Sequence, residues 1–72
     1  MPSWRDLRRF CESDNWELFK NTGDYYYRKD DENGVPRVVK VSKGSGEIGY
    51  HLWREILKKQ LRVSIEYFNS KS

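Results

Sequence analysis

The segment GDYYYRK, residues 23–29, gathers side chains that could form either part of a core or a binding surface. It combines a carboxylate, three consecutive tyrosines and two cations. Side chains of a β-strand alternate between its two faces, so one set must pack toward a core while the other faces outward. The alternation places Asp24, Tyr26 and Arg28 on one face and Tyr25, Tyr27 and Lys29 on the other.

Two roles are open for the outward set. Exposed tyrosines beside Arg28 and Lys29 could bind single-stranded nucleic acid, where stacking contributes about 1–3 kcal/mol per base. Alternatively, these tyrosines pack only on neighbouring strand side chains and keep their hydroxyl groups in water. The sequence does not decide which tyrosine is exposed, because a shift of register by one residue exchanges the two faces.

Basic side chains gather farther along the chain, around the third predicted strand and the second predicted helix. The loop Lys43–Gly46 precedes this helix, and glycines let backbone N–H groups approach an anion near a helix N-terminus. Glu47 in the same loop weakens that interpretation, and a solvated lysine-rich helix with a flexible loop explains the pattern equally. The basic residues are Lys40, Lys43, Arg54, Lys58, Lys59 and Arg62.

The remaining reactive side chains predict no catalytic or metal centre by themselves. His51 is the only histidine, and we expect it on the outer side of a helix as an ordinary surface residue rather than as a general acid or base. Cys11 falls on an apolar helical stripe, where a small buried residue is expected. One histidine and one cysteine do not make a tetrahedral zinc site without several carboxylates, so we expect neither a metal nor a cofactor.

Length and composition limit the class of protein. The 72 residues correspond to one domain, residues 1–72, and the net charge of +3 permits an anionic partner without requiring one. A single cysteine excludes an internal disulfide and favours a reducing compartment. No apolar run approaches the roughly 20 residues of a membrane span, and the N-terminal segment lacks the apolar core of a signal peptide. We therefore expect a cytoplasmic protein without a membrane contact.

Local patterns predict the elements that position these side chains. Ser3 and Asp6 stand where a capping box belongs, directly before an apolar helical stripe. Residues 33–34, Asn-Gly, are a strong hairpin signal between two strands. The predicted bounds are Trp4–Ser13 for the first helix and Asn15–Lys20, Asp24–Lys29 and Val35–Lys43 for the strands.

A second helix and a short last helical turn complete the chain. The turn begins near Val63, and we expect Ile65 and Phe68 to close the core. The fold class is α+β, with the order α-β-β-β-α, and two helices must cover one face of a three-stranded antiparallel sheet, as in double-stranded-RNA-binding domains. The other face is left to water or to a partner. The stripe of the second helix is Leu52, Trp53, Ile56 and Leu57.

From about Ser3 to Phe68, the order of elements and several residues resemble the HicA family of toxins from bacterial toxin–antitoxin systems. The run LWREILK, residues 52–58, is the most specific feature and is similar to the family's L-R-x-I-L-K run. The other matching features are Asn15-Trp16, Tyr27-Arg28, Val38-Val39-Lys40-Val41 and Glu47-Ile48.

The resemblance implies an RNA-binding domain that acts on mRNA and is held by a HicB-like antitoxin protein. The family cleaves RNA with a histidine in a Gly-Ser-His segment, and matching that segment here places Asp24 at the histidine position. Histidine titrates at about pH 6.5 and can act as a base at neutral pH, whereas aspartate, at about 3.9, is a weak base that repels phosphate. The residues expected to bind RNA are Tyr25, Arg28, Lys29, Lys40, Lys43, Arg54 and Lys58.

Three functions follow as hypotheses. The first is a HicA-like toxin that cleaves mRNA without a metal, with Asp24 at its catalytic site. The second is an RNA-binding module that has lost the catalytic histidine. The third is an interaction module that binds an antitoxin-like protein and no RNA, which the modest net charge favours. Binding of RNA separates the first two from the third, and cleavage separates the first from the second.

Overall fold

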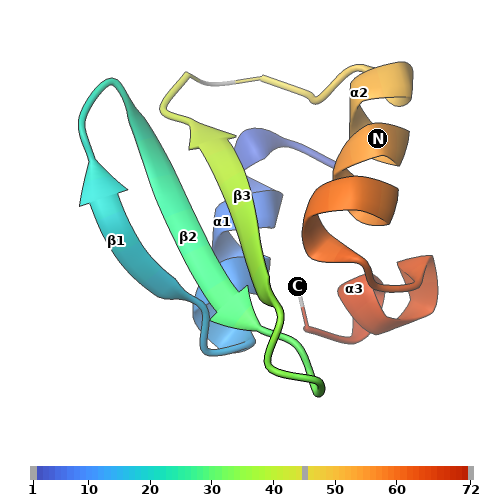
Figure 1. The fold of residues 1–72 in the computed structure, drawn as a ribbon. Coiled ribbons are helices and arrows are strands. Elements are labelled where there is room, and N and C mark those ends of the chain that lie inside the picture. The colour runs from blue at the N-terminus through green and yellow to red at the C-terminus, as the bar shows by residue number, and fades with distance from the viewer. Residues whose placement is uncertain (1, 45, 72) are drawn as a thin grey trace.

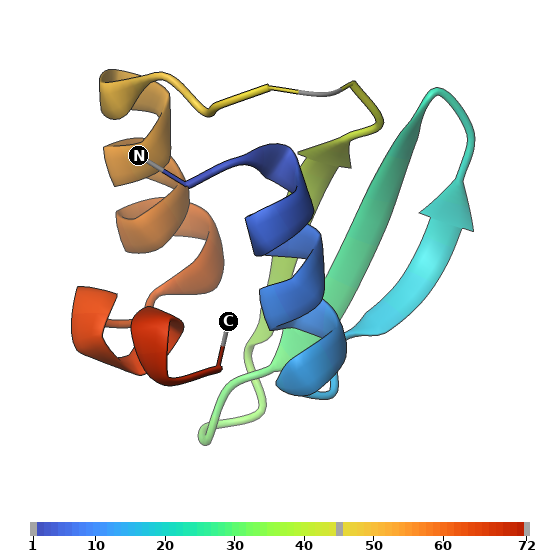
Figure 2. The same cartoon turned by 180° about the vertical axis from the view of Figure 1, so that it is seen from behind.

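The computed structural model describes residues 2–44 and 46–71 as one antiparallel sheet with helices on one side. The elements are α1 (Trp4–Ser13), β1 (Glu17–Asn21), β2 (Asp24–Asp30), β3 (Pro36–Ser42), α2 (Tyr50–Glu55), the π-helix η1 (Ile56–Leu61) and α3 (Ile65–Lys71). α1 lies behind the sheet in Figure 1 and in front of it in Figure 2, whereas α2 and η1 stand beside β3. The predicted α+β class and element order are confirmed, and the predicted last helical turn is the seven-residue helix α3. In the described part of the chain, no helix has the length and apolar character needed to cross a bilayer.

α1 begins at the capping box that the sequence predicts. The Ser3 hydroxyl accepts a hydrogen bond from the Asp6 backbone N–H at 3.1 Å, and the Asp6 carboxylate accepts one from the Ser3 N–H at 2.9 Å. These bonds pair N–H groups that have no partner inside the helix. The helix ends before Asp14, and the positive φ of 60° at Asn15 turns the chain toward the sheet.

The order of strands is β1-β2-β3, and the register decides which tyrosine is buried. Tyr27 pairs with Leu18 on one side and Val39 on the other, and it is only 2% exposed. Tyr25 points to the same side, where it is partly buried and packs against the core. Tyr26 lies on the opposite face, between Lys20 and Lys40 of the neighbouring strands. The predicted alternation is confirmed, and its inward set is the one that contains Tyr27.

β1 is shorter and more exposed than predicted. It begins at Glu17 rather than Asn15, because the left-handed backbone at Asn15 is incompatible with an extended strand. Trp16 is buried just before the strand, whereas Leu18 is 42% exposed. β1 is an edge strand, and its pairing with β2 shifts between Leu18 and Lys20, where Phe19 forms an irregularity.

The core fills the space between the inner sheet face and the helices. Phe68 is buried as predicted, but the expected burial of Leu52 and Ile65 is wrong, since these side chains are 46% and 45% exposed. Both lie at the starts of short helices and face open hollows rather than a packed neighbour. The buried apolar residues are Leu7, Phe10, Cys11, Trp16, Tyr27, Val39, Val41, Ile48, Trp53, Ile56, Leu61 and Phe68.

The second helix is not uniform. After α2 the chain widens into η1, whose Gln60 side-chain oxygen accepts the backbone N–H of Lys40 at 3.3 Å. This bond pairs one N–H on the free edge of β3, beside which η1 stands in Figure 1. Arg62, in the left-handed conformation with φ 56°, ends η1 and redirects the chain into α3.

Candidate nucleic-acid interface

A cleft of about 420 Å³ lies between the first turns of α1 and the end of β3. Its charged lining consists of Arg5, Arg8 and Lys43, and Tyr25 forms part of its wall. No Asp or Glu is among the described residues that line it. We call the surface formed by these four side chains the basic cleft. Glu12, outside this lining, pairs with Arg8 at 3.1 Å. The three cations around one concave surface still produce a positive potential that favours an anion.

The capping box and the loop after β3 build the basic cleft together. Arg5 and Arg8 are three residues apart in α1, so their side chains are neighbours on the helix surface. The loop is tied to the start of α1 by a hydrogen bond from the Trp4 N–H to the Gly46 carbonyl at 3.2 Å. A second bond, from the Ile48 N–H to the Pro2 carbonyl at 2.9 Å, holds the loop farther along. Gly46 has a φ of 123°, a conformation that side-chain-bearing residues rarely adopt.

Tyr25 sets the positions of two of the cations. The Arg8 guanidinium carbon lies 4.3 Å from the centre of the Tyr25 ring, and the Lys43 ammonium nitrogen lies 4.9 Å from it. Lys43 also donates a hydrogen bond to the Thr22 carbonyl at 2.7 Å. A cation over an aromatic face is attracted by the ring quadrupole, so Tyr25 offsets part of the repulsion between Arg8 and Lys43.

Asp24 belongs to a neighbouring hollow of about 350 Å³ beside β3. Its carboxylate is 3.6 Å from the Lys40 ammonium group, and its side chain is 27% exposed. Trp4 and Ser42 line both this hollow and the basic cleft, so the two adjoin. His51 lines neither; it is exposed on α2 with its ring edge against Tyr50 at 5.6 Å between centroids.

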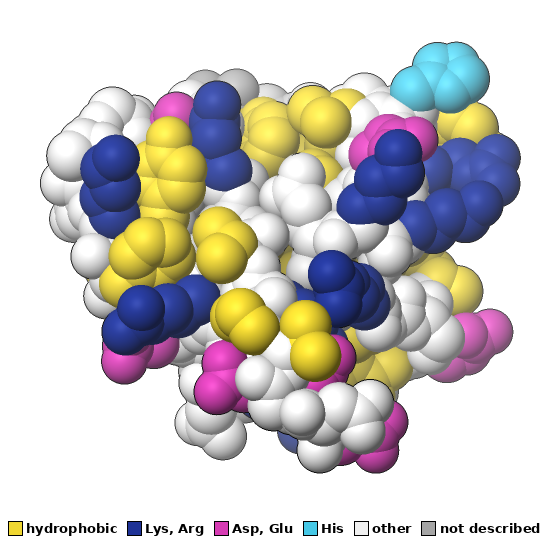
Figure 3. All heavy atoms as spheres, in the orientation of Figure 1, with side chains coloured by type: hydrophobic (Ala, Val, Ile, Leu, Met, Phe, Trp, Pro, Cys, Tyr) yellow, Lys and Arg dark blue, Asp and Glu magenta, His cyan; other side chains and the backbone are white. Residues whose placement is uncertain are grey.

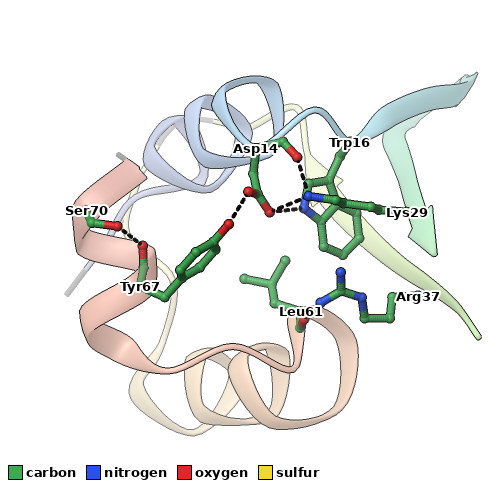
Figure 4. Close-up of polar contacts among 7 residues, drawn as sticks. All are labelled: Asp14, Trp16, Lys29, Arg37, Leu61, Tyr67 and Ser70. Carbon is green, nitrogen blue, oxygen red and sulfur yellow. Dashed lines mark hydrogen bonds and ion pairs between the residues drawn. The ribbon is translucent and has the colours of Figure 1, made fainter. Parts of the chain in front are cut away.

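Lys29 lies away from both hollows. Its ammonium group is 3.1 Å from the Asp14 carboxylate and donates to the Asp14 carbonyl at 2.7 Å (Figure 4). Asp14 is only 5% exposed and also accepts hydrogen bonds from the Trp16 indole and the Tyr67 hydroxyl. The structure therefore gives Lys29 a partner inside the fold, on the inner side of the sheet.

The other predicted RNA-binding residues are distributed over separate surfaces. Arg28 is on the uncovered sheet face and pairs with Glu17 at 2.7 Å. Arg54 projects from α2 over the Tyr50 ring, and Lys58 is exposed on η1. Among the predicted set, only Tyr25 and Lys43 meet in the basic cleft, and Lys40 meets Asp24 beside it.

Arg5 and Arg8 are the residues that sequence reasoning missed. The sequence patterns predicted no binding role for either arginine. Their spacing on the helix was a usable signal, because it predicts two adjacent guanidinium groups. The spacing could not predict that the loop after β3 brings Lys43 next to these arginines.

No family model, curated protein or solved structure matches this chain. Within the described residues, no group of three or more His, Cys, Asp and Glu side chains is placed to hold a metal ion. The chain is a small α+β domain with a three-stranded antiparallel sheet.

Proposed function

We propose that this chain is an RNA-binding protein of the HicA-like type, which holds backbone phosphates in the basic cleft. The observation that carries the proposal is the cleft itself, with Arg5, Arg8 and Lys43 around Tyr25 and no acidic side chain among its described lining residues. Phosphate contacts by Lys and Arg supply most of the sequence-independent affinity for nucleic acids. The HicA resemblance supports RNA as the ligand and implies a HicB-like antitoxin protein as the partner.

Binding without cleavage is the form of this function that the geometry favours. Asp24, at the position of the family's histidine, already forms an ion pair with Lys40. A general base must lie within hydrogen-bonding reach of the proton it removes and titrate near the working pH. The Asp24 carboxylate is held by Lys40 instead, and His51 lies outside both hollows. Cleavage of mRNA without a metal is the alternative, and it requires Asp24 or Tyr25 to act.

Fluorescence anisotropy with a labelled single-stranded RNA, measured at several KCl concentrations, tests the proposal. We expect Arg8→Ala and Lys43→Ala each to weaken binding and to reduce the slope of log K against log salt by about 0.7, the value for one lost phosphate contact on a single strand. Arg9→Ala is the matched control, because Arg9 is an exposed arginine on the same helix that lines a different cleft. Equal effects of all three substitutions would contradict the cleft as the binding site.

Cleavage is measured separately on a denaturing gel, with and without EDTA. We expect intact RNA from the wild-type chain and from Asp24→Ala. Cleavage that persists in EDTA and disappears in Asp24→Ala would replace the binding module with a metal-independent nuclease.

A further inference from the structure

The face of the sheet that points away from α1 carries an aromatic and basic surface outside the basic cleft. No helix crosses this side of β1 and β2 in Figure 1, and Figure 3 shows apolar side chains between Lys and Arg side chains there. We call this surface the outer face. Its residues are Phe19, Lys20, Tyr26, Arg28, Val38 and Lys40.

The register places cations on both sides of an aromatic ring. Tyr26 of β2 is directly opposite Lys20 of β1 and Lys40 of β3, so these three side chains form a row across the sheet. The Lys20 ammonium nitrogen is 5.2 Å from the centre of the Tyr26 ring. The row thus alternates cation, ring and cation at the spacing of adjacent strands, about 4.8 Å.

A second ring lies beside the first. The irregular pairing of β1 at Phe19 brings this ring to 6.3 Å from Tyr26, with 58° between the ring planes, and leaves the Phe19 residue 42% exposed. The Arg28 guanidinium carbon is 5.3 Å from the centre of the Phe19 ring. An exposed phenylalanine on an open sheet face is not explained by the core, which lies on the other side of the sheet.

The acidic groups among these side chains are already paired. Glu17 lies 2.7 Å from Arg28, and Asp24 lies 3.6 Å from Lys40. These pairs partly neutralise Arg28 and Lys40, whereas Lys20 contacts the Tyr26 ring rather than a carboxylate. The outer face therefore offers an exposed Phe19 ring and a half-buried Tyr26 ring, each with a cation near one of its faces. Aromatic rings next to positive charge are the combination that single-stranded nucleic acids use.

We infer that the outer face binds unpaired bases of single-stranded RNA, with Phe19 and Tyr26 stacking on the bases and Lys20 and Lys40 near the backbone. This inference rests on the proposed RNA binding and adds the class of RNA that is preferred. Bases in a duplex are stacked on one another and present only their edges, so a flat aromatic surface gains nothing from them. A base in a single strand has a free π-face that can stack on either ring.

The test compares three oligonucleotides of equal length: a single-stranded RNA, the same backbone with abasic residues, and an RNA duplex. We expect the wild-type chain to bind the single strand more tightly than the abasic strand. Phe19→Leu and Tyr26→Leu retain an apolar side chain but remove the ring, and each should weaken binding of the single strand about 5-fold or more. Their affinity for the abasic strand and their salt slope should not change.

Leu18→Ala is the matched control, because Leu18 is the neighbour of Phe19 on β1 and is equally exposed, at 42%. Circular dichroism verifies that each variant is folded. Equal affinity of the wild-type chain for the single strand and the abasic strand would overturn the inference and leave the proposed function standing. Failure to bind any of the three oligonucleotides would overturn both.

A second copy of this chain is the competing occupant of the outer face. Light scattering across a concentration series decides this point. We expect a monomer at every concentration at which RNA binds. A dimer that dissociates in Phe19→Leu would assign the outer face to self-association and contradict the stacking of bases there.

Discussion

At the scale of single residues, Asp14 connects parts of the chain that are far apart in sequence. It accepts hydrogen bonds from the Trp16 indole at 3.0 Å and from the Tyr67 hydroxyl, and it pairs with Lys29 (Figure 4). Burial raises the pKa of Asp14, but the hydrogen bonds from Tyr67, Lys29 and Trp16 outweigh burial, so the pKa lies below its ordinary value. Removing one donor from a buried carboxylate leaves its charge less well compensated and lowers stability.

Tyr67→Phe should therefore destabilise the fold by about 1.5 kcal/mol at pH 7, because a hydrogen bond to a charged group is lost. The pKa of Asp14 is lowered by folding, so its contribution is complete above its unfolded pKa of about 3.9 and is lost as the pH falls through the lower folded value. Urea unfolding at pH 7 and at pH 3 measures the difference between wild type and variant, which should shrink at the lower pH.

Tyr50→Phe is the control for this change. The Tyr50 hydroxyl accepts only a long contact of 3.4 Å from Arg54, and Tyr50 is 55% exposed. Its removal should leave the free energy of unfolding within about 0.5 kcal/mol of wild type. A loss as large as that of Tyr67→Phe would show that the Asp14 contact has no special weight.

At the scale of elements, the first turn of α1 joins helix stability to the basic cleft. The Ser3 side chain caps the start of the helix. The loop after β3 is hydrogen-bonded to the backbone of Pro2 and Trp4, and Glu47 of this loop forms an isolated antiparallel β-bridge with Ser3. The same turn carries Arg5 into the cleft. Loss of the cap should consequently affect both the helix and the arrangement of its cations.

Ser3→Ala should lower the free energy of unfolding by about 1 kcal/mol, because the Asp6 N–H loses its acceptor. Ser3→Asn should restore most of this loss, since asparagine is an equally good N-cap residue. Denaturant unfolding followed by circular dichroism gives both values. Equal stability of the alanine variant and wild type would mean that the loop contacts alone fix the start of the helix.

At the scale of the whole molecule, one core joins the helices to β2 and β3, while every residue of β1 is exposed. The buried Cys11 thiol lies in this core. Cys11 is 0% exposed, and burial, together with the charges of Asp14 and Glu12, raises the pKa of its thiol to about 12. The thiolate is the form that reacts with alkylating reagents. Both the access and the ionisation of this thiol therefore depend on opening of the core.

Cys11 should resist iodoacetamide at pH 8 in the native protein and react as a free thiol once the core is unfolded in urea. Mass spectrometry after timed alkylation at increasing urea concentrations follows the reaction, and N-acetylcysteine in the same solutions gives the intrinsic rate. The midpoint should coincide with that of circular dichroism. Rapid alkylation without urea would indicate that α1 opens locally, apart from the rest of the core.

The sequence by itself determined the features that depend on near neighbours in the chain. The capping box and the apolar stripe specify α1 to the residue, and the Asn-Gly pair specifies the hairpin, in which Gly34 has a positive φ of 80°. The alternation in residues 24–29 correctly divided the tyrosines into two sets. Such patterns are visible in sequence because each one arises from the period of a helix or a strand, or from the conformational freedom of a turn residue.

Only the tertiary structure decided which face became core and which cations met. The pairing of β2 with both neighbours buried Tyr27 and left Tyr26 outside, and the loop after β3 brought Lys43 to Arg8 across Tyr25. The Lys29 ammonium group pairs with Asp14, which lies 15 residues earlier in the chain. These choices depend on contacts between distant segments, whose energies are set by packing and register together, and no local period in the sequence encodes them.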